Sequence, residues 1–257
     1  MNKTIAVSNP SACWRMMWLA LCGVALISTG CRQTPLTRVI KEKRVQGWKV
    51  PREPMTQMNY LVQLPRGYDE NTNRFWPLVL YLHGIGERGD NLDKVLRFGP
   101  AKLIAAGKDL PCIVVSPQIP DNYFTFRESS ALLALIDEVI ARYRVDARRV
   151  HVTGNSMGGY GAVLLAAREP ERFASLVPIC GGVDYLDSVR LRRVPIWAFH
   201  GEKDPIIPVE ESRRLVRLVK EIGGNARLTI YPDLEHNCWD RAYSDPALWE
   251  WMLAQKK

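Results

Sequence analysis

The sequence has few histidines and cysteines and no regular spacing among them. Four histidines and six cysteines occur in 257 residues, and they do not stand at the short spacings that zinc ligands usually show. We therefore expect no metal site and no cofactor. The glycine-rich stretch 83–90 lacks the G-K-[ST] ending of a phosphate-binding loop, and no internal repeat is visible.

The sequence also has no apolar run that spans a bilayer comfortably. Met16–Ile27 has about a dozen apolar residues, a length typical of a signal peptide. The small residues before Cys31 resemble the lipobox of bacterial lipoproteins, although Ser28 stands where Leu is more usual. We expect residues 1–30 to be a lipoprotein-type signal peptide, Cys31 to be lipidated, and the protein to be exported. The alternatives are an ordinary secretory signal cut near Gly30 and an uncleaved anchor.

The positive charge is not concentrated in one segment. The formal net charge is +8, but the basic residues are scattered, as in Arg213, Arg214 and Arg217, which alternate with apolar residues as on a surface helix. Nucleic-acid binding is therefore not indicated, and a lipid anchor is the only membrane contact that we expect. The sequence leaves the oligomeric state unknown.

Three cysteines remain after the leader and Cys31: Cys112, Cys180 and Cys238. An odd number excludes a complete disulfide framework. Cys180 and Cys238 both follow predicted strands and can pair in an oxidising compartment. The alternative, which we favour, is that all three are buried small apolar residues.

The rest of the chain alternates between predicted strands and helices. Residues 31–58 are charged and without clear periodicity, so we expect a tether, followed by one catalytic domain at 59–257. An edge strand is predicted at 60–64 and further strands at 78–82, 113–116, 150–153, 176–179, 196–199 and 228–231. Helices are predicted at 129–143, 160–168, 210–222 and 246–255. This order predicts an α/β fold with a doubly wound, mostly parallel sheet, helices on both faces and no large lid.

The most informative stretch is Val150–Gly159, in which a short strand leads into Gly154-Asn155-Ser156-Met157-Gly158. A G-x-S-x-G turn between a strand and a helix is the context of a nucleophile elbow. Such a turn is tight, so small residues must flank the serine, and it holds the serine in a strained conformation. We predict that Ser156 is a catalytic nucleophile.

A serine nucleophile needs a base within hydrogen-bond reach. His236 follows the last predicted strand in a loop long enough to reach the elbow, whereas His151 lies inside a strand. His83 and His200 end strands, a position that more often braces a loop. We therefore predict His236 as the base.

The base needs a carboxylate that orients it. Asp204 follows the strand at 196–199 and lies between Ser156 and His236 in chain order, which matches the order Ser, acid, His. The competitors are Asp184, Asp187 and Glu202. We select Asp204.

The negatively charged oxygen of an acyl-transfer intermediate needs N–H donors. One expected donor is the backbone N–H of Met157, the residue after the nucleophile. The other should come from the loop 83–90, where we select Ile85, with Gly84 as the alternative.

These motifs together resemble the α/β-hydrolase superfamily. Within it, the chain resembles bacterial esterases of the phospholipase/carboxylesterase and dienelactone-hydrolase-like group, often described as predicted peptidases of the prolyl-oligopeptidase type. The matching stretches are 82–91, 115–118, 153–161, 178–182, 197–201 with Asp204, and His236 with Trp239. The resemblance covers about residue 60 to the C-terminus and implies the same triad with cofactor-free acyl transfer. Glu235 departs from the pattern, in which a small residue is expected before the histidine.

The leading hypothesis is a serine hydrolase of carboxylic esters. We expect small or polysaccharide-attached acyl or cinnamoyl esters as substrates, with Trp239, Phe124 and Gln118 as substrate-binding residues. The alternatives are a serine peptidase of prolyl-oligopeptidase type and a non-catalytic surface lipoprotein that retains the fold.

Overall fold

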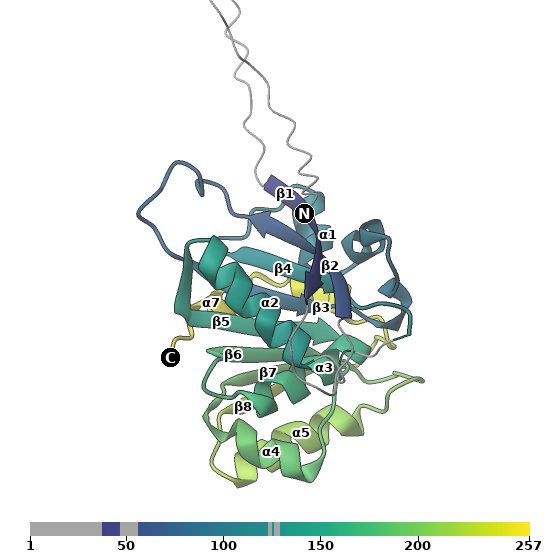
Figure 1. Ribbon diagram of the computed structural model, residues 1–257. Coiled ribbons are helices and arrows are strands. Elements are labelled where there is room, and N and C mark those ends of the chain that lie inside the picture. Colours follow the sequence, from purple (N-terminus) through teal and green to yellow (C-terminus); the bar gives the residue numbers. More distant parts are fainter. Residues whose placement is uncertain (1–37, 47–55, 123–124, 126–128) are drawn as a thin grey trace, which may run out of the picture. The chain divides into compact units, whose positions relative to one another are not determined.

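The computed structural model describes residues 38–46, 56–122, 125 and 129–257, and the side chains from Met58 onward (Figure 1). These residues belong to one compact unit, Leu36–Lys257. The predicted signal peptide, Cys31 and Phe124 lie outside the described residues.

The centre of this unit is an eight-stranded sheet with the order β1-β2-β4-β3-β5-β6-β7-β8. Strands β3 to β8 are parallel to one another, and β1 and β2 are antiparallel to their neighbours. The strands are β1 (Arg38–Gln46), β2 (Thr56–Leu64), β3 (Trp76–Leu82), β4 (Ile113–Gln118), β5 (Val145–Asn155), β6 (Ser175–Ile179), β7 (Ile196–Gly201) and β8 (Ala226–Tyr231). The prediction of a mostly parallel α/β sheet is confirmed.

The first strand was not predicted. Arg38–Gln46 forms β1 within the segment expected to be a tether, and it pairs with β2 from Arg38↔Leu64 to Gln46↔Thr56. Its sequence is rich in charge, which is typical of edge strands, and it lacks the apolar alternation by which a strand is detected. The edge position predicted for 60–64 is therefore wrong, because β2 lies between β1 and β4.

The helices occupy both faces of the sheet, as predicted (Figure 1). One core contains Leu78, Leu80 and Leu82 of β3 together with apolar residues of α2, α3 and α5, and the other contains Val79 and Tyr81 together with α1, α6 and α7. This separation follows from the alternation of side chains along a strand. The helices are α1 (Gly99–Ala105), α2 (Ser129–Arg142), α3 (Met157–Arg168), α4 (Tyr185–Arg190), α5 (Glu210–Glu221), α6 (Trp239–Ser244) and α7 (Pro246–Ala254).

The long helices agree with the predicted ranges, and the short ones were missed. The helices α1, α4 and α6 have seven residues or fewer, as do the 3-10 turns Ile85–Glu87, Leu92–Arg97 and Leu191–Arg193. Segments of this length show too few repeats of the helical period to be detected.

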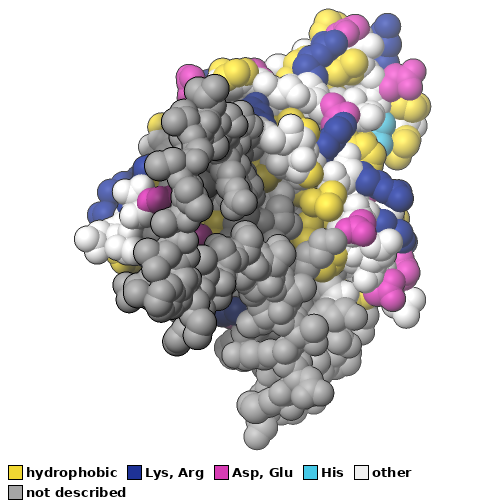
Figure 2. All heavy atoms as spheres, turned by 90° about the horizontal axis from the view of Figure 1, so that it is seen from above, with side chains coloured by type: hydrophobic (Ala, Val, Ile, Leu, Met, Phe, Trp, Pro, Cys, Tyr) yellow, Lys and Arg dark blue, Asp and Glu magenta, His cyan; other side chains and the backbone are white. Residues whose placement is uncertain are grey.

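The surface mixes charges of both signs. Figure 2 shows Lys and Arg side chains beside Asp and Glu on the face that it presents. Arg213 pairs with Glu202, and Arg241 pairs with Asp233. Within the described ranges, no helix has the length and apolar character needed to cross a membrane.

Candidate active site

Ser156 lies at the sharp turn between β5 and α3. Its backbone has φ 56° and ψ −121°, a conformation that is uncommon for a residue with a side chain. A Cβ atom at Gly154 would fall 2.4 Å from the carbonyl oxygen of Gly158, and one at Gly158 would fall 1.9 Å from that of Leu82. The turn can therefore form only with glycine on both sides of Ser156, which explains the G-x-S-x-G spacing.

The turn directs the Ser156 hydroxyl toward His236, which lies in the loop after β8. The Oγ atom of Ser156 is 3.0 Å from Nε2 of His236. Both residues are partly exposed, so a substrate can reach them. Because Nε2 is an acceptor in the neutral ring when Nδ1 carries the proton, this contact can remove the hydroxyl proton.

Asp204 supplies the contact that fixes this tautomer. Its Oδ2 atom is 2.7 Å from Nδ1 of His236. Its Oδ1 atom accepts hydrogen bonds from the backbone N–H groups of Ile206 and Ile207, both at 2.9 Å. The side chain of Asp204 is fully buried, so the carboxylate cannot rotate away from the imidazole without losing both backbone donors.

The two partners shift each other's pKa. Burial alone raises the pKa of Asp204, but hydrogen bonds from His236 and from the backbone outweigh it, and the pKa lies below its usual value. Burial alone lowers the pKa of His236, but its interactions with Cys180 and Asp204 outweigh it, and the pKa is raised. The site therefore favours a carboxylate beside an imidazole that accepts a proton readily.

The remaining histidines are fully buried. Nδ1 of His83 lies 2.6 Å from the Gly84 carbonyl, and its Nε2 accepts the Ile119 N–H at 2.9 Å; burial lowers its pKa to about 4. His151 contacts Ser175, and burial lowers its pKa to about 3. His83 braces the loop after β3, as the sequence predicted.

His200 braces a loop, as its position at the end of a strand predicted, but the sequence did not reveal that this loop carries Asp204. Its Nε2 atom lies 2.9 Å from the Ile207 carbonyl and 3.2 Å from Oδ2 of Asp204, while its Nδ1 atom lies 2.7 Å from the Ser212 hydroxyl. His200 thus braces the turn that carries Asp204. The i, i+4 spacing of His200 and Asp204 after a strand gives no signal of their contact.

The three competing acids lie in other structures. Asp184 caps α4 by accepting the Asp187 N–H, and Asp187 lies in the first turn of that helix. Glu202 accepts two hydrogen bonds from Arg213 at the surface. Asp204 is the acid that the structure brings to His236.

The expected oxyanion donors come from the start of α3 and from the loop after β3. Met157 is the first residue of α3, where backbone N–H groups have no partner within the helix. Gly84 and Ile85 follow β3, and Ile85 begins the 3-10 turn that ends at the buried Glu87. Burial is the chief cause of a raised pKa at Glu87.

The expected substrate-binding residues are placed differently. Gln118 is fully buried, and its amide donates to the carbonyls of Glu87 and Asn91 at 2.8 Å, so it holds the loop after β3 in place of the expected substrate contact. Trp239 lies edge-on to His236, with ring centroids 5.3 Å apart. Its side chain is mostly buried, and its Nε1 atom has no hydrogen-bond partner in the described structure. Glu235 is exposed.

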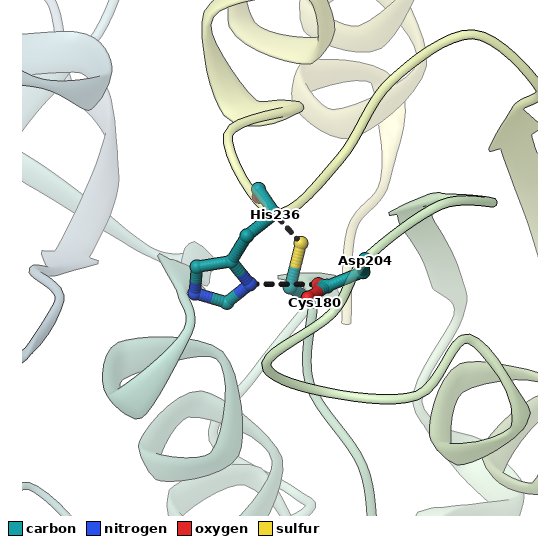
Figure 3. Close-up of side chains that lie close together, drawn as sticks. All are labelled: Cys180, Asp204 and His236. Carbon is teal, nitrogen blue, oxygen red and sulfur yellow. Dashed lines mark hydrogen bonds and ion pairs between the residues drawn. The ribbon is translucent and has the colours of Figure 1, made fainter.

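A thiol lies beside the backbone of His236. Cys180 directly follows β6, and its Sγ atom donates to the backbone carbonyl of His236 at 3.2 Å (Figure 3). The ligand atoms of Cys180, Asp204 and His236 lie within 4.8 Å of one another, and these atom types can ligate zinc. A metal bound there would displace the proton that links Asp204 to His236, so it would be incompatible with the hydrogen-bonded triad.

The dienelactone hydrolase family model matches residues 121–246. This stretch contains Ser156, Asp204 and His236. The chain has the α/β-hydrolase fold and carries a dienelactone hydrolase family domain. The family resemblance drawn from the sequence motifs is thereby confirmed.

Solved structures of esterases are similar to this chain. A thermostable esterase is 33% identical with a TM-score of 0.69, over 84% of this chain and 63% of its own. A ferulic acid esterase is 18% identical with a TM-score of 0.64, over 85% of this chain and 97% of its own. The second similarity concerns the fold alone.

Acyl-protein thioesterase 1 of Gibberella zeae is 37% identical over 46 residues, which are 18% of this chain. The matched part spans 20% of that thioesterase, so the chain corresponds to only a fraction of this relative.

Proposed function

We propose that this chain is an exported serine hydrolase that cleaves carboxylic esters through an acyl-enzyme. The observation that carries the proposal is the continuous contact from Ser156 Oγ to His236 Nε2, at 3.0 Å, and from His236 Nδ1 to Asp204 Oδ2, at 2.7 Å. The dienelactone hydrolase family match and the esterases of the same fold support an ester as the bond that is cleaved.

In the first half of the reaction, Ser156 Oγ attacks the carbonyl carbon of the ester while its proton moves to Nε2 of His236. The carbonyl oxygen becomes negatively charged and accepts hydrogen bonds from the backbone N–H groups of Met157 and Ile85. The carbon–oxygen bond to the alcohol then breaks, and Nε2 returns the proton to the departing oxygen. An acyl group remains on Ser156.

In the second half, water replaces the alcohol. His236 takes a proton from the water as its oxygen attacks the acyl carbon, and then gives that proton to Ser156 Oγ as the carboxylic acid leaves. Asp204 stays ionised throughout and stabilises the imidazolium form of His236.

Similar proteins and the residues beside the triad support a proposal for the substrate class. Neighbours of the same fold include a ferulic acid esterase and a feruloyl esterase module from Clostridium thermocellum complexed with sinapinate. The mostly buried ring of Trp239 packs edge-on against His236, so the site has an aromatic neighbour. We infer small or polysaccharide-linked acyl and cinnamoyl esters as substrates.

Export and anchoring are part of the same proposal. Residues 1–30 have the pattern of a lipoprotein signal peptide, and Cys31 is the proposed lipid attachment site. We expect the wild-type protein in the membrane fraction of a bacterial host and the Cys31→Ser variant outside it. A Cys31→Ser variant that stays in the membrane fraction would contradict lipidation at Cys31.

The decisive experiment compares p-nitrophenyl acetate hydrolysis by the wild type and by Ser156→Ala. Removal of the nucleophile should lower kcat by about 10⁴-fold or more. Ser130→Ala is the matched control, because Ser130 lies in α2 and contacts Arg168, and its kcat should stay within about twofold of wild type. Unchanged turnover in Ser156→Ala would eliminate the proposed nucleophile.

A substrate panel then tests the ester class. Methyl ferulate, an acetylated sugar and a dipeptide p-nitroanilide should separate cinnamoyl esterase, acetyl esterase and peptidase activities. We expect the highest kcat/KM on an ester. A higher kcat/KM on the anilide would favour a peptidase, and no turnover on any of the three would favour a non-catalytic binding protein.

A further inference from the structure

Two buried cysteines lie against each other beneath the loop that carries His236. The Sγ atoms of Cys180 and Cys238 are 3.3 Å apart, although the residues are 58 positions apart in the sequence. Both side chains are fully buried. A disulfide bond is about 2.05 Å long, so the two sulfur atoms need to approach by only about 1.3 Å to be joined.

Both cysteines also bind the backbone of the histidine between them. The Cys180 thiol and the Cys238 N–H donate to the carbonyl oxygen of His236, at 3.2 and 2.9 Å. Figure 3 shows the Cys180 contact on the side of His236 where its backbone lies, with the imidazole turned toward Asp204. The two cysteines therefore contact the backbone of His236, whereas its reacting nitrogen, Nε2, faces Ser156.

We propose that Cys180 and Cys238 are a disulfide-forming pair that ties the His236 loop to the end of β6. The disulfide itself follows from the position of the two sulfurs, whereas its importance for a catalytic loop rests on the proposed function. Cys180 has a positive φ of 50°, so the chain turns sharply at this residue after β6. The cross-link would fix that turn to the residue before α6.

The oxidation is a thiol–disulfide exchange with an external small-molecule disulfide such as oxidised glutathione. One cysteine thiolate attacks the external disulfide and releases one small thiol. The second cysteine thiolate then attacks the mixed disulfide and releases the other. The two protein thiols lose two protons and two electrons, the Cys180–Cys238 bond forms, and the external disulfide is reduced to two thiols.

Burial controls when this reaction takes place. The pKa of Cys180 is raised by its hydrogen bond with Cys238 and by burial, and exchange requires a thiolate that the external disulfide can reach. The folded protein should therefore oxidise slowly, and a chain that folds in the presence of oxidised glutathione should acquire the bond during folding.

The disulfide should stabilise the fold and leave the chemistry nearly unchanged. Closing a long loop in the unfolded chain raises stability, which for a chain of this size corresponds to a melting temperature higher by roughly 5 to 10 °C. The bond removes the thiol donor from the His236 carbonyl, but the Cys238 N–H still binds it. At a pH well above the pKa of His236, where the effect of Cys180 on that pKa does not matter, we expect kcat to stay within about twofold of the reduced protein, since neither nitrogen of His236 changes its partner.

Peptide mapping tests whether the bond forms. The full-length chain is unfolded in urea, refolded in a glutathione redox buffer or in dithiothreitol, alkylated and digested with trypsin. The tryptic peptides 173–190 and 228–241 should be joined after oxidising refolding and separately alkylated after reducing refolding. Alkylation of both peptides after oxidising refolding would overturn the proposal.

Melting curves with and without dithiothreitol test what the bond does. The melting temperatures of wild type and Cys112→Ala should fall by the same several degrees on reduction, because Cys112, which lies before β4, is not part of the Cys180–Cys238 pair. The melting temperature of Cys238→Ala should not depend on reduction. Each variant is compared with itself, so a lower overall stability of Cys238→Ala does not affect the result. A joined pair that leaves the melting temperature unchanged would overturn the stabilising tie.

Esterase assays of wild type and Ser156→Ala, compared with the peptide mapping, show whether the disulfide proposal and the proposed function stand or fall separately. If the wild type proves inactive but its peptides are joined and its melting temperature depends on reduction, the disulfide stands and the esterase assignment fails. If the esterase activity depends on Ser156 and the peptides stay separate, the reverse holds.

Discussion

Two histidines contact Asp204, one at the end of a strand and one in a loop. His236, after β8, uses Nδ1 for Asp204 and keeps Nε2 for Ser156. His200, at the end of β7, uses Nε2 for Asp204 and for the Ile207 carbonyl, and its Nδ1 lies against Ser212. Both rings face the same carboxylate, but only His236 has a nitrogen left for a nucleophile.

The pKa values of the two histidines are shifted in opposite directions. His200 is fully buried and its pKa is lowered, chiefly by burial, whereas the interactions of the partly exposed His236 raise its pKa. Contact with a carboxylate is therefore not sufficient to make a histidine a base. The ring must also keep a free nitrogen and enough solvent contact to carry a charge.

Of the two histidines, His236 should show the larger loss of kcat when it is replaced. His236→Ala removes the base and should lower kcat on p-nitrophenyl acetate by about 10⁴- to 10⁶-fold, as is typical for a triad histidine. The double variant with Ser156→Ala should lose little more, because the two groups act as one unit. Retention of more than about one per cent of wild-type kcat by a folded His236→Ala protein would contradict the assignment.

The pH dependence should report His236 alone. Catalysis needs the neutral imidazole, and the raised pKa of His236 places the acid limb of kcat/KM above pH 6.5, the usual value. Below that limb the rate should fall about tenfold per pH unit. The pKa of His200 is lowered, chiefly by burial, so its ionisation should lie below that of His236.

The slope of this limb is the measurement that matters. One ionisation gives a slope of one in a plot of log kcat/KM against pH. A slope of two would mean that a second group, such as His200, titrates with His236, and the contrast between the two rings would be lost.

The smallest effect is expected at His200, which acts through Asp204. His200→Ala removes the brace between Asp204 and the Ile207 carbonyl and should lower kcat about tenfold with KM nearly unchanged, an effect typical of a displaced catalytic group. His200→Gln, whose amide can donate from a similar position, should restore most of the loss. Equal loss of kcat in both variants would contradict a positioning role.

The local parts of the site could be predicted because they depend on neighbouring residues. The nucleophile elbow is encoded by Gly154 and Gly158, which are required by backbone contacts within the turn. The strands that precede Ser156, Asp204 and His236 are apolar runs with clear ends. Because β5, β7 and β8 are parallel, the residues that follow them gather at one edge of the sheet.

Other features could not be predicted because they depend on long-range packing. The assignment of β1 to the sheet depends on its pairing with β2, and its charged sequence hides it. The inward position of Gln118 depends on the loop after β3, whose carbonyls it binds. The contact of Cys180 with Cys238 depends on how the ends of β6 and β8 are spaced.

The sequence by itself determined the α/β alternation, the elbow at Ser156 and the order of serine, acid and histidine, because these are written in local patterns and chain order. Only the tertiary structure decided that Asp204 is the acid that meets His236, that His200 braces it, and that two cysteines meet behind the loop. The physical reason is that hydrogen bonds of about 3 Å between side chains distant in sequence depend on the packing of the whole sheet.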